Sequence, residues 1–258
     1  MRCKAKLRSV AAESGQRERP KLLLSWSSGK DSAWALHRLR QCGEFELVGL
    51  VTTLNRSFER VSMHAVRELL LERQAAATGL PLWKVSLPHP CSNERYEEAM
   101  TELVERARRT GVSAMAFGDL FLEEIRRYRE QQLAGSGIEP RFPLWQLSTA
   151  ELAREMVDAG LGARLTCVDP RQLPRRFAGR EFDHDLLSEL PAGVDPCGER
   201  GEFHTFVYRG PMFRESVEVE AGEITLRDGF VFADLLPRDA AQQASLLQAT
   251  RQARAAER

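Results

Sequence analysis

Short apolar runs alternate with longer amphipathic segments between residues 22 and 134. Runs of this kind predict β-strands, and apolar residues at helical spacing predict helices between them. The expected strands are 22–24, 47–53, 82–87 and 112–117, and the expected helices are 31–41, 61–78, 93–110 and 120–134. Continuous apolar strands separated by helices are typical of a parallel sheet that is covered on both faces.

The pattern changes after residue 134. A Gly- and Pro-rich segment, 135–143, is expected to be a linker or a long loop. Beyond it we expect a helix at 149–159, a strand at 163–168, a polar loop at 169–201, and short strands at 203–208, 216–219, 223–226 and 230–232. This mixture predicts a smaller α+β domain.

Composition and charge limit the classes of protein to which this chain can belong. The 258 residues are 43% hydrophobic and 29% charged, and Lys plus Arg equal Asp plus Glu at 37 each. A zero net charge favours a small-molecule or protein ligand over nucleic acid, which usually requires a basic field. No apolar run approaches the roughly 18 residues of a membrane span. The five scattered cysteines contain no CxxC pair and indicate reduced thiols, so we expect a cytoplasmic protein.

The segment Ser25 to Ser32 (SWSSGKDS) follows an apolar strand and opens a helix. In such a turn, successive backbone N–H groups and the helix dipole form an anion site. The hydroxyls of Ser27, Ser28 and Ser32 add donors, and Lys30 adds a positive charge. Asp31 would be repelled by phosphates unless it holds a cation, which implies Mg²⁺. Because Asp31 follows Lys30, the segment is not a Walker A loop.

This loop resembles the SGGKDS motif of the pyrophosphatase-loop ATP enzymes, with Ser28 in place of the first Gly. The resemblance implies a Rossmann-like sheet of the adenine nucleotide alpha hydrolase type, with ATP at the carboxyl ends of the strands. Enzymes of this type cleave ATP between the α- and β-phosphates. A substrate oxygen attacks the α-phosphorus, and pyrophosphate leaves from the loop.

Over residues 21–236 the chain resembles one family more specifically, the diphthine–ammonia ligases and their bacterial relatives. The segments that carry this resemblance are Ser27–Ser32, Met63-His64, Phe117-Gly118-Asp119, Arg126–Glu130, Pro143-Leu144-Trp145, Gly179-Arg180, Cys197–Phe206 and Gly210–Phe213. In that family, ATP and ammonium convert the carboxylate of diphthine, a modified histidine on a translation elongation factor, into an amide, and AMP and pyrophosphate leave.

The late motif departs from the archaeal and eukaryotic form, GEGGE(F/Y)ET. This chain has Arg200 where those ligases have Gly, and His204 where they have Glu. The His form resembles the bacterial branch, and bacteria do not carry diphthamide. The resemblance therefore implies the adenylation chemistry and leaves the carboxylate acceptor open, diphthine or a related bacterial one. It also leaves a monomer or a homodimer open.

The motifs nominate the residues of the site. The candidates for the chemistry are Lys30, Asp31, Glu199 and Glu202, and Asp31 is the expected metal ligand. The candidates for holding ATP are Ser25, Ser27, Ser28, Gly29, Lys30, Ser32, His64, Gly118, Asp119, Arg126 and Arg129.

Several of these candidates have a structural alternative. Asp119 could cap the following helix. Arg126 and Arg129 share one helix face and could clamp phosphate or simply be solvated. The two glutamates could line the acceptor site, bind ammonium, act as a base or lie exposed in the loop. His64 could be purely structural. Strand alternation would place Glu202 and His204 on one face.

The expected organisation is a disordered lead-in (1–20), an ATP-binding domain (21–145), an α+β substrate domain (146–237) and a tail (238–258). Free ammonia is the expected nitrogen source because there is no room for a glutaminase domain. Two other functions remain open: a tRNA-modifying enzyme that uses the same loop, and a non-catalytic ATP-binding regulator. The missing CxxC and the neutral charge argue against the first, and the absence of a late glycine pattern argues against the second.

Overall fold

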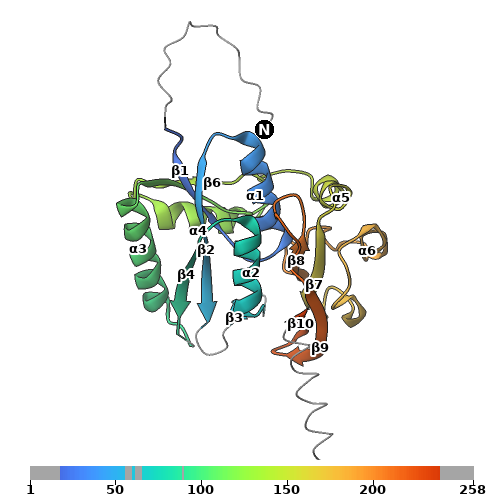
Figure 1. The fold of residues 1–258 in the computed structure, drawn as a ribbon. Helices are drawn as coiled ribbons and strands as arrows, with labels where there is room; N and C mark the ends of the chain where they lie inside the picture. The colour runs from blue at the N-terminus through green and yellow to red at the C-terminus, as the bar shows by residue number, and fades with distance from the viewer. Residues whose placement is uncertain (1–17, 56–59, 62–65, 89, 239–258) are drawn as a thin grey trace, which may run out of the picture.

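The first lobe is built on the predicted parallel sheet (Figure 1). The computed structural model describes residues 18–55, 60–61, 66–88 and 90–238. The parallel strands lie in the order β4-β2-β1-β5-β6. Their bounds are β1 (Lys21–Ser25), β2 (Glu46–Asn55), β4 (Leu82–Leu87), β5 (Val112–Ala116) and β6 (Glu139–Arg141), and the short β3 (Arg60–Val61) runs antiparallel to the end of β2.

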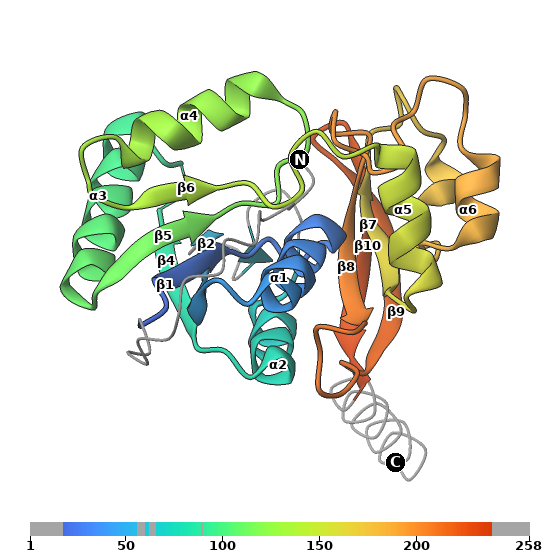
Figure 2. The same ribbon diagram turned by 90° about the horizontal axis from the view of Figure 1, so that it is seen from above.

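Helices cover both faces of this sheet, as Figure 2 shows. One face carries α1 (Lys30–Cys42) and α2 (Glu68–Thr78), and the other carries α3 (Asn93–Arg109) and α4 (Glu123–Leu133). The alternation of side chains along β1 explains the arrangement. Leu22 and Leu24 pack in the core beneath α1 and α2, whereas Leu23 packs with residues of α3 on the opposite face.

The second lobe is an antiparallel sheet in the order β8-β7-β10-β9. Its strands are β7 (Gly162–Val168), β8 (Phe203–Arg209), β9 (Val219–Arg227) and β10 (Phe230–Pro237). The helices α5 (Thr149–Asp158) and α6 (His184–Glu189) lie beyond this sheet as seen from α1 and α2 (Figure 2), and the 3-10 turn η1 (Arg175–Phe177) comes between β7 and α6 in the chain. No helix within the described ranges is long and apolar enough to cross a membrane.

Four expectations about elements are corrected. The segment 135–143 is not only a loop, because it contains β6, and Pro140 is tolerated there since β6 lies at the edge of the sheet. Residue 61 belongs to β3, so the helix predicted at 61–78 begins only at Glu68. One strand, β9, takes the place of the two strands predicted at 216–219 and 223–226, and it begins only at Val219. The polar stretch 169–201 contains η1 and α6.

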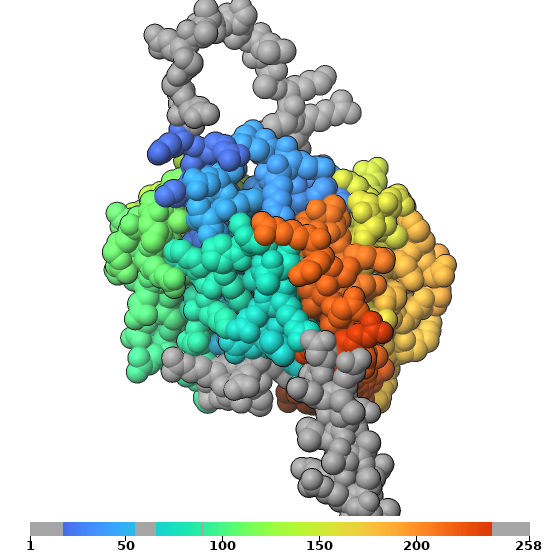
Figure 3. All heavy atoms as spheres, viewed as in Figure 1, coloured from blue at the N-terminus to red at the C-terminus, as the bar shows by residue number. Residues whose placement is uncertain are grey.

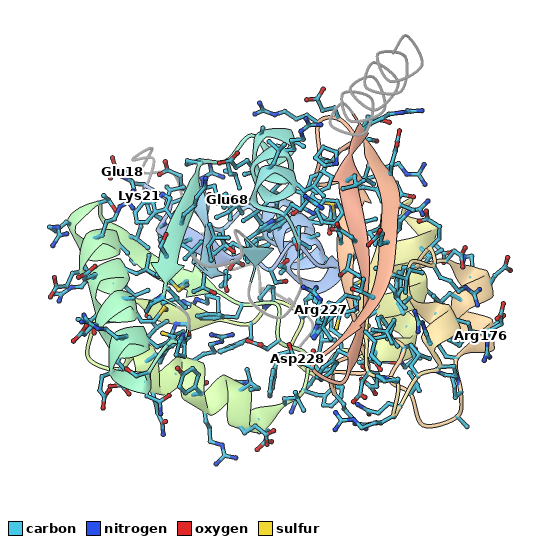
Figure 4. All side chains as sticks on the ribbon, turned by 90° about the horizontal axis from the view of Figure 1, so that it is seen from below. Glu18, Lys21, Glu68, Arg176, Arg227 and Asp228 are labelled. Atoms are coloured by element: carbon cyan, nitrogen blue, oxygen red, sulfur yellow. The ribbon has the colours of Figure 1, made fainter. Side chains whose placement is uncertain are left out.

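The two lobes share one apolar core. Buried residues of α1 and α2 pack in the same cluster as buried residues of β8 and β10. On the face drawn in Figure 3, the atoms of α2 meet those of the C-terminal strands across the lobe boundary. The division expected at 145/146 falls between β6 and α5 and stays a prediction. His64, residues 1–17 and residues 239–258 lie outside the described residues.

Candidate active site

A cavity of about 230 Å³ lies where the carboxyl ends of β1 and β5 meet the second lobe. Residues from four segments that are far apart in the sequence line it: Ser25, Ser27, Gly29, Lys30, Asp31, Ser32, Phe117, Gly118, Asp119, Arg129, Gly198, Glu199, Phe203, His204 and Thr205. Most of the residues nominated by the sequence motifs therefore come together at one place.

Serine hydroxyls close the loop between β1 and α1. Ser32 Oγ accepts a hydrogen bond from Ser27 N at 3.3 Å and donates to Gly29 O at 3.0 Å. The hydroxyl of Ser27 lies 3.2 Å from that of Ser32 and accepts from Gly29 N at 3.4 Å. These short-range bonds hold the turn that the sequence predicted to face phosphates.

Ser28 has a different place from the one expected. Its φ of 71° lies in the left-handed region, which favours glycine. The family motif has Gly at this position. Its carbonyl accepts from Val207 N and from Gln74 Nε2, both at 3.0 Å. Its hydroxyl is buried, does not line the cavity, and has no hydrogen-bond partner within the described part of the chain. Ser28 shapes the loop rather than facing the cavity.

Lys30 lies in the wall of the cavity, but its ammonium group is already occupied. Nζ lies 2.9 Å from both carboxylate oxygens of Asp31 and donates to the carbonyl of Cys197. It also lies 5.5 Å from the ring centroid of Phe203. Burial acts to lower the pKa of Lys30, but Asp31 and the other acidic groups nearby together hold the pKa above its usual value. Lys30 therefore stays charged and ties the loop to the second lobe.

The turn after β5 lies directly against α1. A Cβ on Gly118 would come within 2.9 Å of Asp31 C and Ser32 N, so only glycine permits this approach. Asp119 follows, and it does not cap α4, because the N-cap of that helix is Leu122. Burial raises the pKa of Asp119 more than Arg129 lowers it.

The two arginines of α4 point to different places. Arg129 lines the cavity, with its Nε 3.9 Å from Asp119 Oδ2 and its guanidinium 5.0 Å from the ring centroid of Phe117. Arg126 does not line the cavity. It pairs with Glu130 at 2.7 Å and lies 4.8 Å from the ring centroid of Trp145. Of the two arginines expected to hold a ligand, only Arg129 therefore lies at the cavity.

The two candidate glutamates also occupy different positions relative to the cavity. Glu199 lines the cavity, and its Oε1 accepts from Leu120 N at 2.8 Å. Burial raises its pKa to about 7. Glu202 is buried below the loop and does not line the cavity. Its two oxygens accept from Asp195 N and Arg200 N, both at 2.9 Å, so it organises the loop that presents Glu199.

His204 lines the cavity from β8. Burial lowers its pKa to about 4, and Lys30 acts in the same direction, so the imidazole is neutral at pH 7. Glu202 precedes β8, which begins at Phe203. The expected pairing of Glu202 and His204 on one strand face is therefore wrong.

Two family models match the chain. The diphthamide synthase N-terminal domain matches residues 20–140, and the diphthamide synthase C-terminal domain matches residues 148–235. The chain belongs to the diphthamide synthase family. The N-terminal match contains the loop 25–32 and the turn at Gly118, and the C-terminal match contains Glu199 and His204. Each of the two matched domains therefore supplies one side of the cavity.

Relatives of this diphthamide synthase family member carry the name diphthine–ammonia ligase. The protein from Homo sapiens is 25% identical over 192 residues, which cover 68% of this chain and 70% of the human protein. The protein from Danio rerio is 27% identical over 175 residues, which cover 62% of this chain and 68% of the fish protein. The resemblance inferred from the motifs is confirmed at the level of the family.

A second cavity, of about 180 Å³, adjoins the first. The two share Ser25, Ser27, Phe117 and Arg129. Apolar side chains of β2, α3 and β5 line part of the second cavity, among them Val51, Met100 and Met115. It also contains Thr52, whose buried Oγ1 has no hydrogen-bond partner among the described residues. In this diphthamide synthase family member, the two adjoining cavities form one candidate site.

Sequence reasoning missed Thr52, Phe203 and Thr205 as lining residues. Thr52 stands at the carboxyl end of an apolar strand, where parallel sheets place ligands, so it could have been found from its position. Phe203 and Thr205 lie beside the recognised late motif, but only the packing of β8 against the loop shows that they face it.

Proposed function

We propose that this chain is an ATP-dependent ligase that adenylates a carboxylate and converts it into an amide with ammonia, releasing AMP and pyrophosphate. The acceptor we propose is diphthine or a related bacterial carboxylate. The single observation that carries the proposal is the joining of the ATP loop and the late motif in one cavity. The family match and the names of the relatives support the same reaction class.

The paired cavities suit the two ends of ATP. The loop 25–32 and the start of α1 would bind the pyrophosphate half, because backbone N–H groups and a helix N-terminus favour anions. The adjoining cavity would take the adenosine half, with the apolar residues against the base and the Thr52 hydroxyl as a polar contact. Arg129, shared by both, lies where it could neutralise the α-phosphate.

The carboxylates fit Mg²⁺. Asp31 and Asp119 line the same cavity, and the buried Asp119 Oδ2 has no hydrogen-bond partner among the described residues. Mg²⁺ typically uses one or two carboxylates together with phosphate oxygens and water, so it needs no larger protein cluster. When bound there, it would neutralise charge on the phosphates.

Glu199 is our proposed base. A carboxyl group with a pKa of about 7 can take a proton from ammonium at neutral pH. The ammonia nitrogen would then attack the carbonyl carbon of the adenylated carboxylate, the bond from that carbon to the phosphate oxygen would break, and AMP would leave. His204 lines the same cavity from β8 and would contact the acceptor as a neutral imidazole.

The test is the release of AMP and pyrophosphate from ATP, Mg²⁺ and ammonium, first with an elongation factor that carries diphthine and then with other carboxylates. Asp31→Asn should abolish release because Mg²⁺ and Lys30 both lose their partner. Arg129→Gln should raise the KM for ATP about tenfold, because the variant loses one charge-assisted hydrogen bond to the nucleotide. Arg127→Gln, on the exposed side of the same helix, is the matched control and should change nothing.

Two results would refute the assignment. One is ADP as the product, because the loop would then not hold the pyrophosphate half. The other is undiminished AMP formation by Asp31→Asn, provided that thermal melting shows the variant to be folded. Release that depends on tRNA would favour the modifying-enzyme alternative.

A further inference from the structure

The first backbone N–H of α1 is capped by the second lobe. The N-cap residue, Gly29, has no side chain, and no side-chain cap from its own loop replaces it. Lys30 N instead donates to Thr205 Oγ1 of β8 at 3.0 Å, across 175 residues of sequence. Helix N-terminal N–H groups are ordinarily capped by a residue just before the helix. Here the cap comes from another lobe.

The backbone of β8 lies equally close to the loop. Val207 N donates to Ser28 O at 3.0 Å. A Cβ on Gly29 would come within 3.2 Å of Thr205 O, so the strand and the loop touch along their backbones. The cap is therefore a fixed feature of the interface rather than the chance reach of a long side chain.

The Thr205 hydroxyl has a proton left to donate. A threonine hydroxyl has one donor and two acceptor positions. One acceptor position is used by Lys30 N, and no acceptor for its proton is found within the residues that the structure describes. Thr205 is only 2% exposed, yet it lines the 230 Å³ cavity. A buried donor that faces a cavity indicates a ligand with an acceptor atom.

We propose that Thr205 donates this hydrogen bond to a phosphate oxygen in the pyrophosphate half of the nucleotide, so that the second lobe completes the phosphate site. The inference rests on the proposed function only in taking ATP as the ligand. The hydroxyl stands between the helix N-terminus and the cavity, and the bond that it accepts from Lys30 N polarises its own O–H toward an anion. The ATP site is thus shared between the lobes.

Calorimetric titration with pyrophosphate, ATP and AMP tests the inference without any turnover. Thr205→Val keeps the shape and removes the donor. Its affinity for pyrophosphate and ATP should fall about tenfold, the cost of one hydrogen bond to a charged group, while AMP binds as before. Thr205→Ser should restore wild-type affinities. Thr166→Val is the matched control, because this buried threonine of the neighbouring strand donates to His204 O and does not line the cavity.

Unchanged pyrophosphate affinity in Thr205→Val would overturn the inference. An equal loss for AMP and pyrophosphate would also overturn it, because a purely structural cap would act on both. If the valine variant does not fold, Thr205→Cys, with similar volume and a weak donor, takes its place under the same criteria. Failure of the amide-forming reaction would leave this binding test intact, so the two proposals fail separately.

Discussion

At the scale of the residue, burial sets the chemistry of Glu199. Its surroundings exclude water and raise its pKa to about 7, although the bond from Leu120 N opposes the shift. Asp31 adds to the rise through its negative charge, and Lys30 opposes it. A carboxyl group in this range can exchange a proton at neutral pH, which is what a base for ammonium requires.

We expect the rate of amide formation at saturating ammonium to rise with pH and level off above about pH 7, as Glu199 loses its proton. Glu199→Gln should lower that rate on the order of 100-fold and remove this limb of the profile. Hydroxylamine, which is uncharged at neutral pH, should restore much of the activity because it needs no base. A variant that keeps the wild-type profile would exclude Glu199 as the base.

The raised pKa of Glu199 also affects the stability of the fold. Its dependence on pH is opposite to that of an ion-paired carboxylate, whose pKa is lowered. Because the folded-state pKa lies above the usual value of 4.5, protonation stabilises the fold fully below pH 4.5, and this contribution is lost as pH rises through about 7. Glu199→Gln should therefore melt higher than wild type at pH 8 and equally at pH 4. The amide oxygen can still accept from Leu120 N, so packing is unchanged.

How far sequence predicts single residues depends on whether the geometry is local. Ser27, Gly29 and Asp31 were predicted at the cavity because a strand, a loop and a helix place them there. The bond from Lys30 Nζ to Cys197 O was not predictable, since the two residues are 167 positions apart. Glu202 does not line the cavity, because its oxygens accept from the loop N–H groups of Asp195 and Arg200 and strand alternation does not orient it.

At the scale of the element, the meeting of β5 with α1 places the turn at Gly118 beside the loop. Gly118→Ala should force the two backbones apart and destabilise the fold by roughly 2 kcal/mol, in the range of overpacking changes. Gly29→Ala should destabilise the fold less, because a Cβ on Gly29 would lie 3.2 Å from its nearest backbone atom, whereas a Cβ on Gly118 would lie 2.9 Å from its nearest. Urea unfolding measures both, and a larger loss for Gly29→Ala would contradict the geometry.

Elements with strong periodicity were predicted closely. The strand at 82–87 and the start of the helix at 93 agree with β4 and α3. The two missed strands, β6 and β3, are strands only because each pairs with another strand. The edge strand β6 contains Pro140 and only three residues, and it is a strand because β5 offers a parallel edge. The antiparallel β3 is likewise defined by β2.

At the scale of the whole molecule, Gln74 of α2 joins the lobes from within the core. Its Oε1 accepts from Trp26 Nε1 at 3.0 Å, and its Nε2 donates to Ser28 O and to Val207 O. Gln74→Leu would leave the buried Trp26 Nε1 without its partner and remove one bond each from Ser28 O and Val207 O, so it should destabilise the protein by about 3 kcal/mol. Exposed Gln131→Leu, on the surface of α4, should change stability by less than about 0.5 kcal/mol.

Calorimetry would measure the loss and show one transition for both lobes, because their cores are continuous. Two separate transitions, with only one shifted by Gln74→Leu, would contradict this coupling. The sequence did predict a change of architecture near residue 145. It could not predict that the second sheet packs directly on α1 and α2, because no local pattern records which apolar faces meet.

The threonine cap on α1 also has a consequence for synthesis. Lys30, in the loop proposed to bind phosphate, is translated 175 residues before Thr205, an interval of roughly 9 to 35 s at about 5–20 residues per second. During that time a nascent chain would hold the loop but lack its cap and the strand behind it. Firm nucleotide binding would therefore begin only once the carboxyl-terminal lobe has left the ribosome, and a truncated translation product would be unable to sequester ATP.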